Sequence, residues 1–129
     1  MATHAPPNDD LPIRLRGIAF VSPSFDCPGG RHGQARTLAE ALARHGVPIT
    51  YATTRTPGVT APAVEVRGLV TVYRLPGALH DDPETTLGLL ELFALGVFAK
   101  RQSRLNLVYG AGDGAAVAAR VAAALELPA

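Results

Sequence analysis

Residues 18–53, which read IAFVSPSFDCPGGRHGQARTLAEALARHGVPITYAT, decide the fold of this chain. Residues 13–21 begin with alternating apolar and polar positions and end continuously apolar, which is typical of a central parallel strand buried on both faces. The glycine- and proline-rich residues 22–33 predict a loop, residues 34–45 predict a helix, and the β-rich residues 48–53 predict a second strand. The order strand, loop, helix, strand is the start of an α/β sheet.

The first helix is well delimited in the sequence. Its apolar positions form one stripe made of Ala35, Leu38, Ala39, Leu42 and Ala43. Gly46 is suited to the left-handed position that ends a helix, and Pro48 forbids its continuation.

The later segments continue the same alternation. Residues 63–67 and 69–75 predict a small hairpin, and the chain then predicts a helix over 82–102, a strand over 105–110 and a helix over 115–125. We therefore expect an α/β fold, with an open, doubly wound, mostly parallel sheet and one hairpin. The favoured topology places the first strand beside residues 105–110, with the helices that follow them on opposite faces.

Length and composition set the broad class. The chain has 129 residues, 47% of them hydrophobic, and we expect one Rossmann-like domain over 13–129 after a disordered tail over 1–12. The net charge of +1 disfavours a nucleic-acid-binding protein. The tail lacks the pattern of a secretory signal, and the apolar stretch 87–99 is shorter than the roughly 20 residues of a membrane span. Cys27 is the single cysteine, so no intramolecular disulfide forms, and we expect a partly buried, inert thiol in a cytoplasmic protein.

Two glycine-rich loops, residues 22–33 and 110–114, are expected to meet where the first and last strands end. Ligands of open α/β sheets bind in the crevice at that point. Candidate phosphate-binding positions in the first loop are Gly29, Gly30, Arg31, His32 and Gly33, because free N–H groups at a helix start attract anions. A plain connection between strand and helix accounts for them equally well. Asp113 in the second loop is a candidate ligand contact in the crevice, although a cap for the helix that follows is the favoured interpretation.

Several of these segments, taken together, resemble the N-terminal domain of GT-B glycosyltransferases of the family-4 kind. The matching segments are Pro28-Gly29-Gly30, Leu38-Ala39-Glu40-Ala41-Leu42, Arg44 to Pro48, Gly68 to Pro76, Asn106 to Gly112, and Leu125 to Pro128. The chain departs from the family at Tyr109 and Ala111, where histidines are usual. The resemblance covers nearly the whole chain after the tail.

This resemblance implies the acceptor-side domain of a retaining, nucleotide-sugar-dependent glycosyltransferase. It implies that the chain is a fragment, incomplete at its C-terminus and lacking the donor-binding half, and that it is inactive alone. A sugar nucleotide would be the donor substrate of the complete enzyme, and no further cofactor is implied. No metal ligand and no catalytic residue is assigned to this domain. Partners would be a small-molecule acceptor or the sugar nucleotide, a separate donor-domain chain, a second copy of the chain or peripheral contact with a membrane. The alternative is a non-catalytic ligand-binding or regulatory module of Rossmann or flavodoxin type.

Four further expectations concern single features. Residues 80–82 (His-Asp-Asp) make a poor metal cluster, since adjacent side chains point apart, and Asp82 is expected to cap a helix. Glu91 lies at a polar edge or faces a missing partner. Tyr51, Phe93 and Phe98 are assigned to the core. The outer edge of residues 105–110 is expected to be free, which favours self-association.

Overall fold

The computed structural model describes residues 16–26, 30–56, 58–76 and 83–129, without the side chains of residues 30–33 and 83. The expected tail over 1–12, the residues Cys27 and Gly29 of the first loop, and the cluster at 80–82 lie outside this part of the chain.

Five strands form one open sheet in the order β3-β4-β2-β1-β5. They are β1 (Ile18–Val21), β2 (Ile49–Thr53), β3 (Val64–Arg67), β4 (Val70–Arg74) and β5 (Leu107–Gly110). All neighbours are parallel except β3 and β4, which form an antiparallel hairpin. The expected fold class and the expected pairing of the first strand with the last are therefore confirmed.

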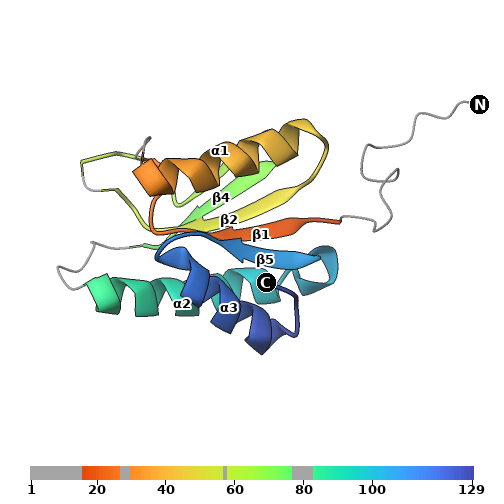
Figure 1. The fold of residues 1–129 in the computed structure, drawn as a ribbon. Coiled ribbons are helices and arrows are strands. Elements are labelled where there is room, and N and C mark those ends of the chain that lie inside the picture. Colours follow the sequence, from red (N-terminus) through yellow and green to blue (C-terminus); the bar gives the residue numbers. More distant parts are fainter. Residues whose placement is uncertain (1–15, 27–29, 57, 77–82) are drawn as a thin grey trace, which may run out of the picture.

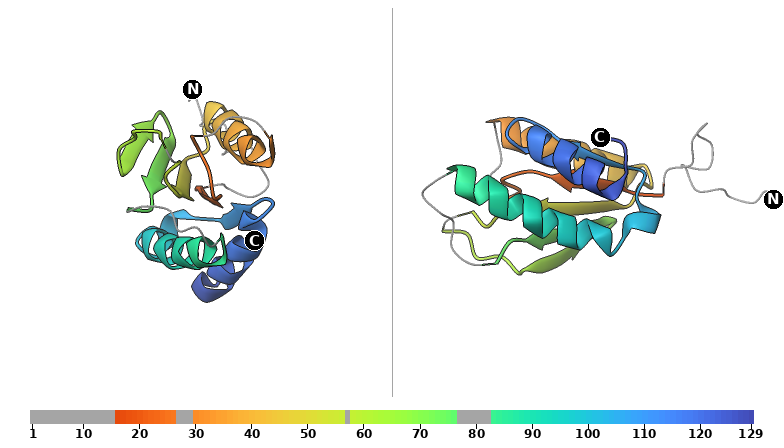
Figure 2. Two further views of the ribbon diagram at one scale, coloured as in Figure 1. Left: turned by 90° about the vertical axis from the view of Figure 1, so that its left-hand side faces the viewer. Right: turned by 90° about the horizontal axis from the view of Figure 1, so that it is seen from below.

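Three helices cover the two faces of this sheet. They are α1 (Gly30–Arg44), α2 (Pro83–Ala99) and α3 (Gly114–Leu125), and a short 3-10 helix, η2 (Gln102–Arg104), precedes β5. Helix α1 lies on one face, and α2 and α3 lie together on the other (Figure 1). The same layering is visible end-on and from below in Figure 2. The core consequently has two halves, one beneath α1 and one between the sheet and the α2–α3 pair.

The two ends of α1 differ in how well the sequence predicts them. Gly46 takes a φ of 89°, the left-handed conformation predicted for the helix end. The helix begins at Gly30 rather than Gln34, so the glycine-rich stretch forms its first turn. Helix propensity is a weak preference that tertiary contacts override, and residues on both sides of this turn are anchored in the structure. Leu38 is 38% exposed, so the expected apolar stripe is wider than the buried face.

Helix α2 packs against both the sheet and α3, as the expectation of burial on more than one side requires, but part of its circumference is exposed. Leu90, Ala94 and Phe98, spaced four apart, are fully buried and form its inner face. Leu89 and Leu92 are 37% and 68% exposed, because the sheet and α3 cover only part of the helix circumference. Phe93, expected in the core, is only partly buried. The helix thus presents an apolar outer face to solvent.

Two other expectations are corrected by contacts of α3 and the residues after it. Of the two alternatives for Glu91, the missing partner is wrong, because its Oε1 accepts a hydrogen bond from Nε of Arg120 at 2.6 Å. The outer edge of β5 is not wholly free, because the Val108 N–H donates to the Pro128 carbonyl at 2.9 Å. Of the helices in the described ranges, none has both the length and the apolar character needed to cross a bilayer.

Candidate functional site

The carboxyl ends of the central strands and the start of α1 lie at one edge of the sheet, on the left in Figure 1. In the register of the sheet, Val21 at the end of β1 pairs with Ala52 of β2 on one side and Gly110 of β5 on the other. The chain leaves β1 toward α1 on one face and leaves β5 toward α3 on the other. This pair of strands is therefore the topological switch point at which open α/β sheets place their ligands.

The first half of the loop after β1 is fixed to the sheet. Ser22 Oγ donates to the Ser24 carbonyl at 3.1 Å, and the Tyr51 hydroxyl donates to the same carbonyl at 3.4 Å. Thr54 Oγ1 donates to the Pro23 carbonyl. Tyr51 is fully buried, and this burial raises the pKa of its phenol to about 12. The side of the loop that faces Tyr51 is therefore shielded from solvent.

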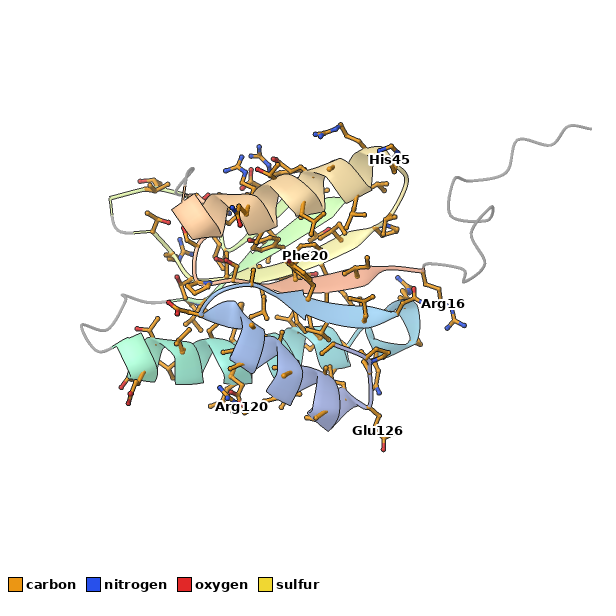
Figure 3. All side chains as sticks on the ribbon, in the orientation of Figure 1. Arg16, Phe20, His45, Arg120 and Glu126 are labelled. Carbon is orange, nitrogen blue, oxygen red and sulfur yellow. The ribbon has the colours of Figure 1, made fainter. Side chains whose placement is uncertain are left out.

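Phe25 anchors the same loop in the core beneath α1. Its ring, 1% exposed, meets the ring of Tyr51 edge-on with centroids 4.9 Å apart. The guanidinium of Arg36 lies 4.3 Å from the Phe25 centroid, and its Nη1 donates to the Phe25 carbonyl at 3.0 Å. Behind this contact Phe20 stacks on Tyr51, and Figure 3 shows Phe20 on the α1 side of β1. Positions 25 and 36, on either side of the glycine stretch, are thus held together.

Arg74, at the carboxyl end of β4, is the most deeply buried charged group of this edge. It is 1% exposed and donates to both oxygens of Asp26, to Glu65 Oε1 at 2.9 Å and to the Pro62 carbonyl at 2.9 Å. Burial alone would lower its pKa, but the bonds to Asp26 and Glu65 outweigh burial and raise it. Arg74 therefore keeps its charge and neutralises the acid nearest to the α1 start.

The ionic network around this edge is balanced. Its members are Arg36, Arg67, Arg74, Asp26, Glu40 and Glu65. The three positive and three negative side chains of this network cancel formally. The first turn of α1 contains no acidic residue. The partial positive charge of the helix start is therefore not offset by its own sequence.

Two buried hydroxyl oxygens at this edge, Ser24 Oγ and Thr53 Oγ1, have no hydrogen-bond partner among the described residues. Thr53 is the last residue of β2 and is fully buried. It shares a strand face with Ile49 and Tyr51, which belong to the core beneath α1. Buried polar atoms are almost always satisfied, so a water or ligand atom is the expected partner of Thr53.

The glycines of the second loop serve packing. A Cβ on Gly110 would lie 2.2 Å from the Gly114 carbonyl oxygen, and a Cβ on Gly114 would lie 2.6 Å from the Val21 carbonyl oxygen. Gly112 takes a left-handed φ of 59°. These glycines let α3 start directly against the end of β1, which closes this side of the switch point.

No protein-family model matches the chain, and a search of curated proteins finds no relative. The glycosyltransferase resemblance therefore stays a prediction that rests on the quoted segments.

The candidate residues divide into three groups. Gly30, Arg31, His32 and Gly33 form the first turn of α1, at the expected edge, and Gly29 lies outside the described residues. Asp113 occupies the N-cap position of α3, as favoured, but its side chain makes no capping hydrogen bond and is exposed. The carboxylate of Asp113 is consequently available to a ligand at the same edge as the α1 start.

Sequence reasoning missed Arg74, Asp26 and Thr53. A charged or polar residue at the end of an otherwise apolar strand was the available signal for Arg74 and Thr53. Among the described residues, no group of three or more His, Cys, Asp or Glu side chains is arranged to hold a metal ion.

Proposed function

We propose that this chain is the acceptor-side, Rossmann-like domain of a retaining, nucleotide-sugar-dependent glycosyltransferase, and that the α1 start binds the donor phosphates. One observation carries the proposal. Helix α1 begins at the β1–β5 switch point with no acid in its first turn, while Arg74 neutralises the nearby Asp26. Free N–H groups and the helix dipole at such a position favour a phosphate.

The remaining polar groups fit the same ligand. Glycines at 29, 30 and 33 permit close approach of phosphate to the backbone, Arg31 supplies a positive charge, and His32 supplies a ring N–H donor. Thr53 Oγ1 supplies an unused hydroxyl, and Asp113 supplies an exposed carboxylate for a sugar hydroxyl. In this proposal these groups bind and orient the ligand, and none of them takes part in bond making or breaking.

In this proposal the donor-binding half comes from a further domain or from a separate chain. No catalytic residue is assigned here, and the 129 residues alone are expected to bind nucleotide without transferring sugar. The cytoplasmic location expected from the sequence is part of the same proposal.

A binding titration of the ¹⁵N-labelled chain tests the proposal. Uridine and guanosine diphosphates and their sugar esters are added, with the nucleosides as controls. We expect the diphosphates, but not the nucleosides, to shift the amide signals of residues 22, 24–26, 30–34 and 53–54. The absence of such shifts at millimolar ligand would overturn the proposal.

A matched pair of variants isolates the helix start. Gly33→Glu adds a carboxylate to the first turn of α1, and Gly33→Gln adds a neutral side chain of the same shape. The acid repels a phosphate but suits the helix dipole, so we expect Gly33→Glu to weaken diphosphate binding about tenfold more than Gly33→Gln does. Equal binding by the two variants contradicts a phosphate at this position.

The non-catalytic module predicts a different pattern. It would bind a nucleotide or another anion with no preference between a sugar nucleotide and its parent diphosphate. It would also gain no transferase activity when a donor-binding domain is supplied. Sugar transfer by the purified chain alone would contradict both the fragment proposal and the module.

A further inference from the structure

A cavity lies away from the switch point, between β4 and the C-terminal half of α2. It has a volume of about 720 Å³, within the range of about 300–1,000 Å³ typical of small-molecule sites. Tyr73 of β4 lines it on one side and Gly96 of α2 on the other. An adjoining cavity of about 410 Å³ shares Arg101 and Arg104 with it and reaches the amino ends of β1 and β2.

One wall of the larger cavity is apolar and comes from the outer face of α2. Leu92, Phe93 and Val97 line it, and Leu92 is 68% exposed. Leaving apolar surface in water costs about 25 cal/mol per Å², so a ligand that covers these side chains gains affinity from their burial. Tyr73 contributes an aromatic ring to the same space.

The opposite part of the two cavities is cationic. Lys100, Arg101 and Arg104 line the larger one, and Arg16 joins Arg101 and Arg104 in the smaller. Of the described residues that line the two cavities, none is acidic. Among the described residues, no ion pair links any of these four cations to a carboxylate.

The contacts that these side chains do make leave their charges uncompensated. Arg101 Nη2 donates to the Tyr73 hydroxyl, and the guanidinium lies 5.4 Å from the Tyr73 ring centroid. Arg16 Nη1 donates to the Ser103 carbonyl at 3.1 Å. The C-terminal end of α2 offers only about half a negative charge to offset four cations. Helix capping therefore does not account for the cluster.

We propose that these joined cavities form a binding site for a small amphiphilic anion. Its phosphate or carboxylate group would lie between Arg101 and Arg104, and its apolar group would cover Leu92, Phe93 and Val97. The arginines at this place suit a planar or tetrahedral oxyanion, because their donors are fixed in a fork. The site is separate from the α1 start: Figure 3 shows Arg16 at the end of the sheet opposite to the beginning of α1.

Calorimetric titration with three simple probes tests the site. They are hexyl phosphate, inorganic phosphate and hexanol, which present both halves of the ligand, the anion alone and the apolar group alone. We expect hexyl phosphate to bind at least about tenfold more tightly than either of the others. Equal binding of hexyl phosphate and inorganic phosphate would contradict the apolar half of the site.

Paired variants locate the binding. Arg104→Gln should weaken hexyl phosphate binding about tenfold, whereas Arg120→Gln, which removes an exposed arginine from α3, should leave it unchanged. Leu92→Ser should weaken it several-fold, and Val66→Ser, at an exposed position of β3, should not. Equal effects within either pair would overturn the assignment.

Two additional measurements distinguish this site from the α1 start and from a lipid-binding surface. Gly33→Glu should leave unchanged the part of hexyl phosphate binding that depends on Arg104 and Leu92, because Gly33 lines neither cavity. Failure here and failure of the proposed function are thereby distinguished. Sedimentation with vesicles of phosphatidylglycerol and phosphatidylcholine tests a lipid surface as the source of the anion. Vesicle binding that depends on Arg104 and Leu92, without binding of soluble hexyl phosphate, would replace the small-ligand site by a membrane-contact surface.

Discussion

The guanidinium of Arg74 binds the carboxylate of Asp26 with two hydrogen bonds, Nη2 to Oδ1 at 2.7 Å and Nε to Oδ2 at 2.9 Å. Forty-eight positions of sequence separate the two residues. The pair joins the end of β4 to the loop that leads into α1, and it is nearly closed to solvent, with side chains 1% and 12% exposed. The first loop is thereby fixed relative to the sheet before the glycine stretch begins.

Removing the buried arginine should therefore be costly. Arg74→Met leaves Asp26 and Glu65 without their shared cation, and we expect it to lower the free energy of unfolding by about 3–5 kcal/mol. The matched change at the exposed Arg120, which pairs with Glu91, should cost less than about 1 kcal/mol. Urea unfolding of both variants measures the difference, and similar losses would show that the Arg74 network does not stabilise the fold.

Stability should also fall in acid because of Glu65. Hydrogen bonds from Arg74 hold the pKa of the Glu65 carboxyl below its ordinary value of 4.5. The unfolded chain then binds a proton at a higher pH than the folded chain does, so this contribution is complete above pH 4.5. It is lost as the pH falls from 4.5 through the lowered value. Glu65→Gln should flatten that part of a urea-derived stability curve, and an unchanged slope would contradict the assignment.

Tyr51 should titrate above the ordinary range of a phenol. Burial raises the pKa of its phenol from 10.0 to about 12, so the folded state keeps this proton while the unfolded state loses it. Its contribution to stability is complete below pH 10 and declines as the pH rises from 10 toward 12. Ultraviolet titration of the chain and of Tyr51→Phe should differ by a late-titrating tyrosine, and identical curves would show a solvated Tyr51.

The glycines of the second loop should tolerate no side chain. Gly110→Ala places a Cβ 2.2 Å from a backbone oxygen of Gly114, and we expect a loss of about 2–3 kcal/mol in the free energy of unfolding. Gly88→Ala is the control, because nothing lies within 4 Å of its added Cβ on the exposed side of α2. That change should raise stability by up to about 1 kcal/mol, as alanine favours a helix interior. Thermal unfolding would refute the packing role if both variants moved in the same direction.

Thr53→Val should separate stability from binding. The variant removes a buried hydroxyl that lacks a partner among the described residues, and we expect about 1 kcal/mol of added stability. Diphosphate binding should weaken at the same time, because the proposed ligand loses a donor at the end of β2. A variant that is more stable and binds the diphosphate equally well would remove Thr53 from the site.

The helices that flank the sheet show how far the sequence pattern predicts packing. Every expected strand and helix is present, with shifted boundaries. Residues 16 and 17, predicted in the first strand, precede β1, and α1 begins four residues before its predicted start at residue 34. The sequence of α2 is apolar nearly all round, yet Leu92 is largely exposed. The apolar character of a side chain determines how much free energy its burial would contribute. Whether the side chain is buried depends on how many neighbouring helices and strands cover it.

The candidate site was predictable in position but not in detail. The glycine-rich loop and the strand order place the α1 start at the switch point without further information. The packing roles of Gly110 and Gly114 could not be predicted. Glycine occurs both where a ligand approaches the backbone and where a helix packs closely against a strand, and the sequence does not distinguish the two cases. The pairing of Glu91 with Arg120 was likewise hidden, since the two residues lie on different helices.

The sequence by itself determined the fold class, the order of elements and the central pairing of β1 with β5. Those features follow from local periodicity, helix-ending residues and the handedness of parallel connections, which act over short stretches of chain. Only the tertiary structure decided that Arg74 meets Asp26 and that Tyr73 and Arg16 lie beside the cations at the end of α2. Such contacts join residues far apart in the chain, and their energies depend on burial and mutual distance, which exist only once the sheet and helices have packed.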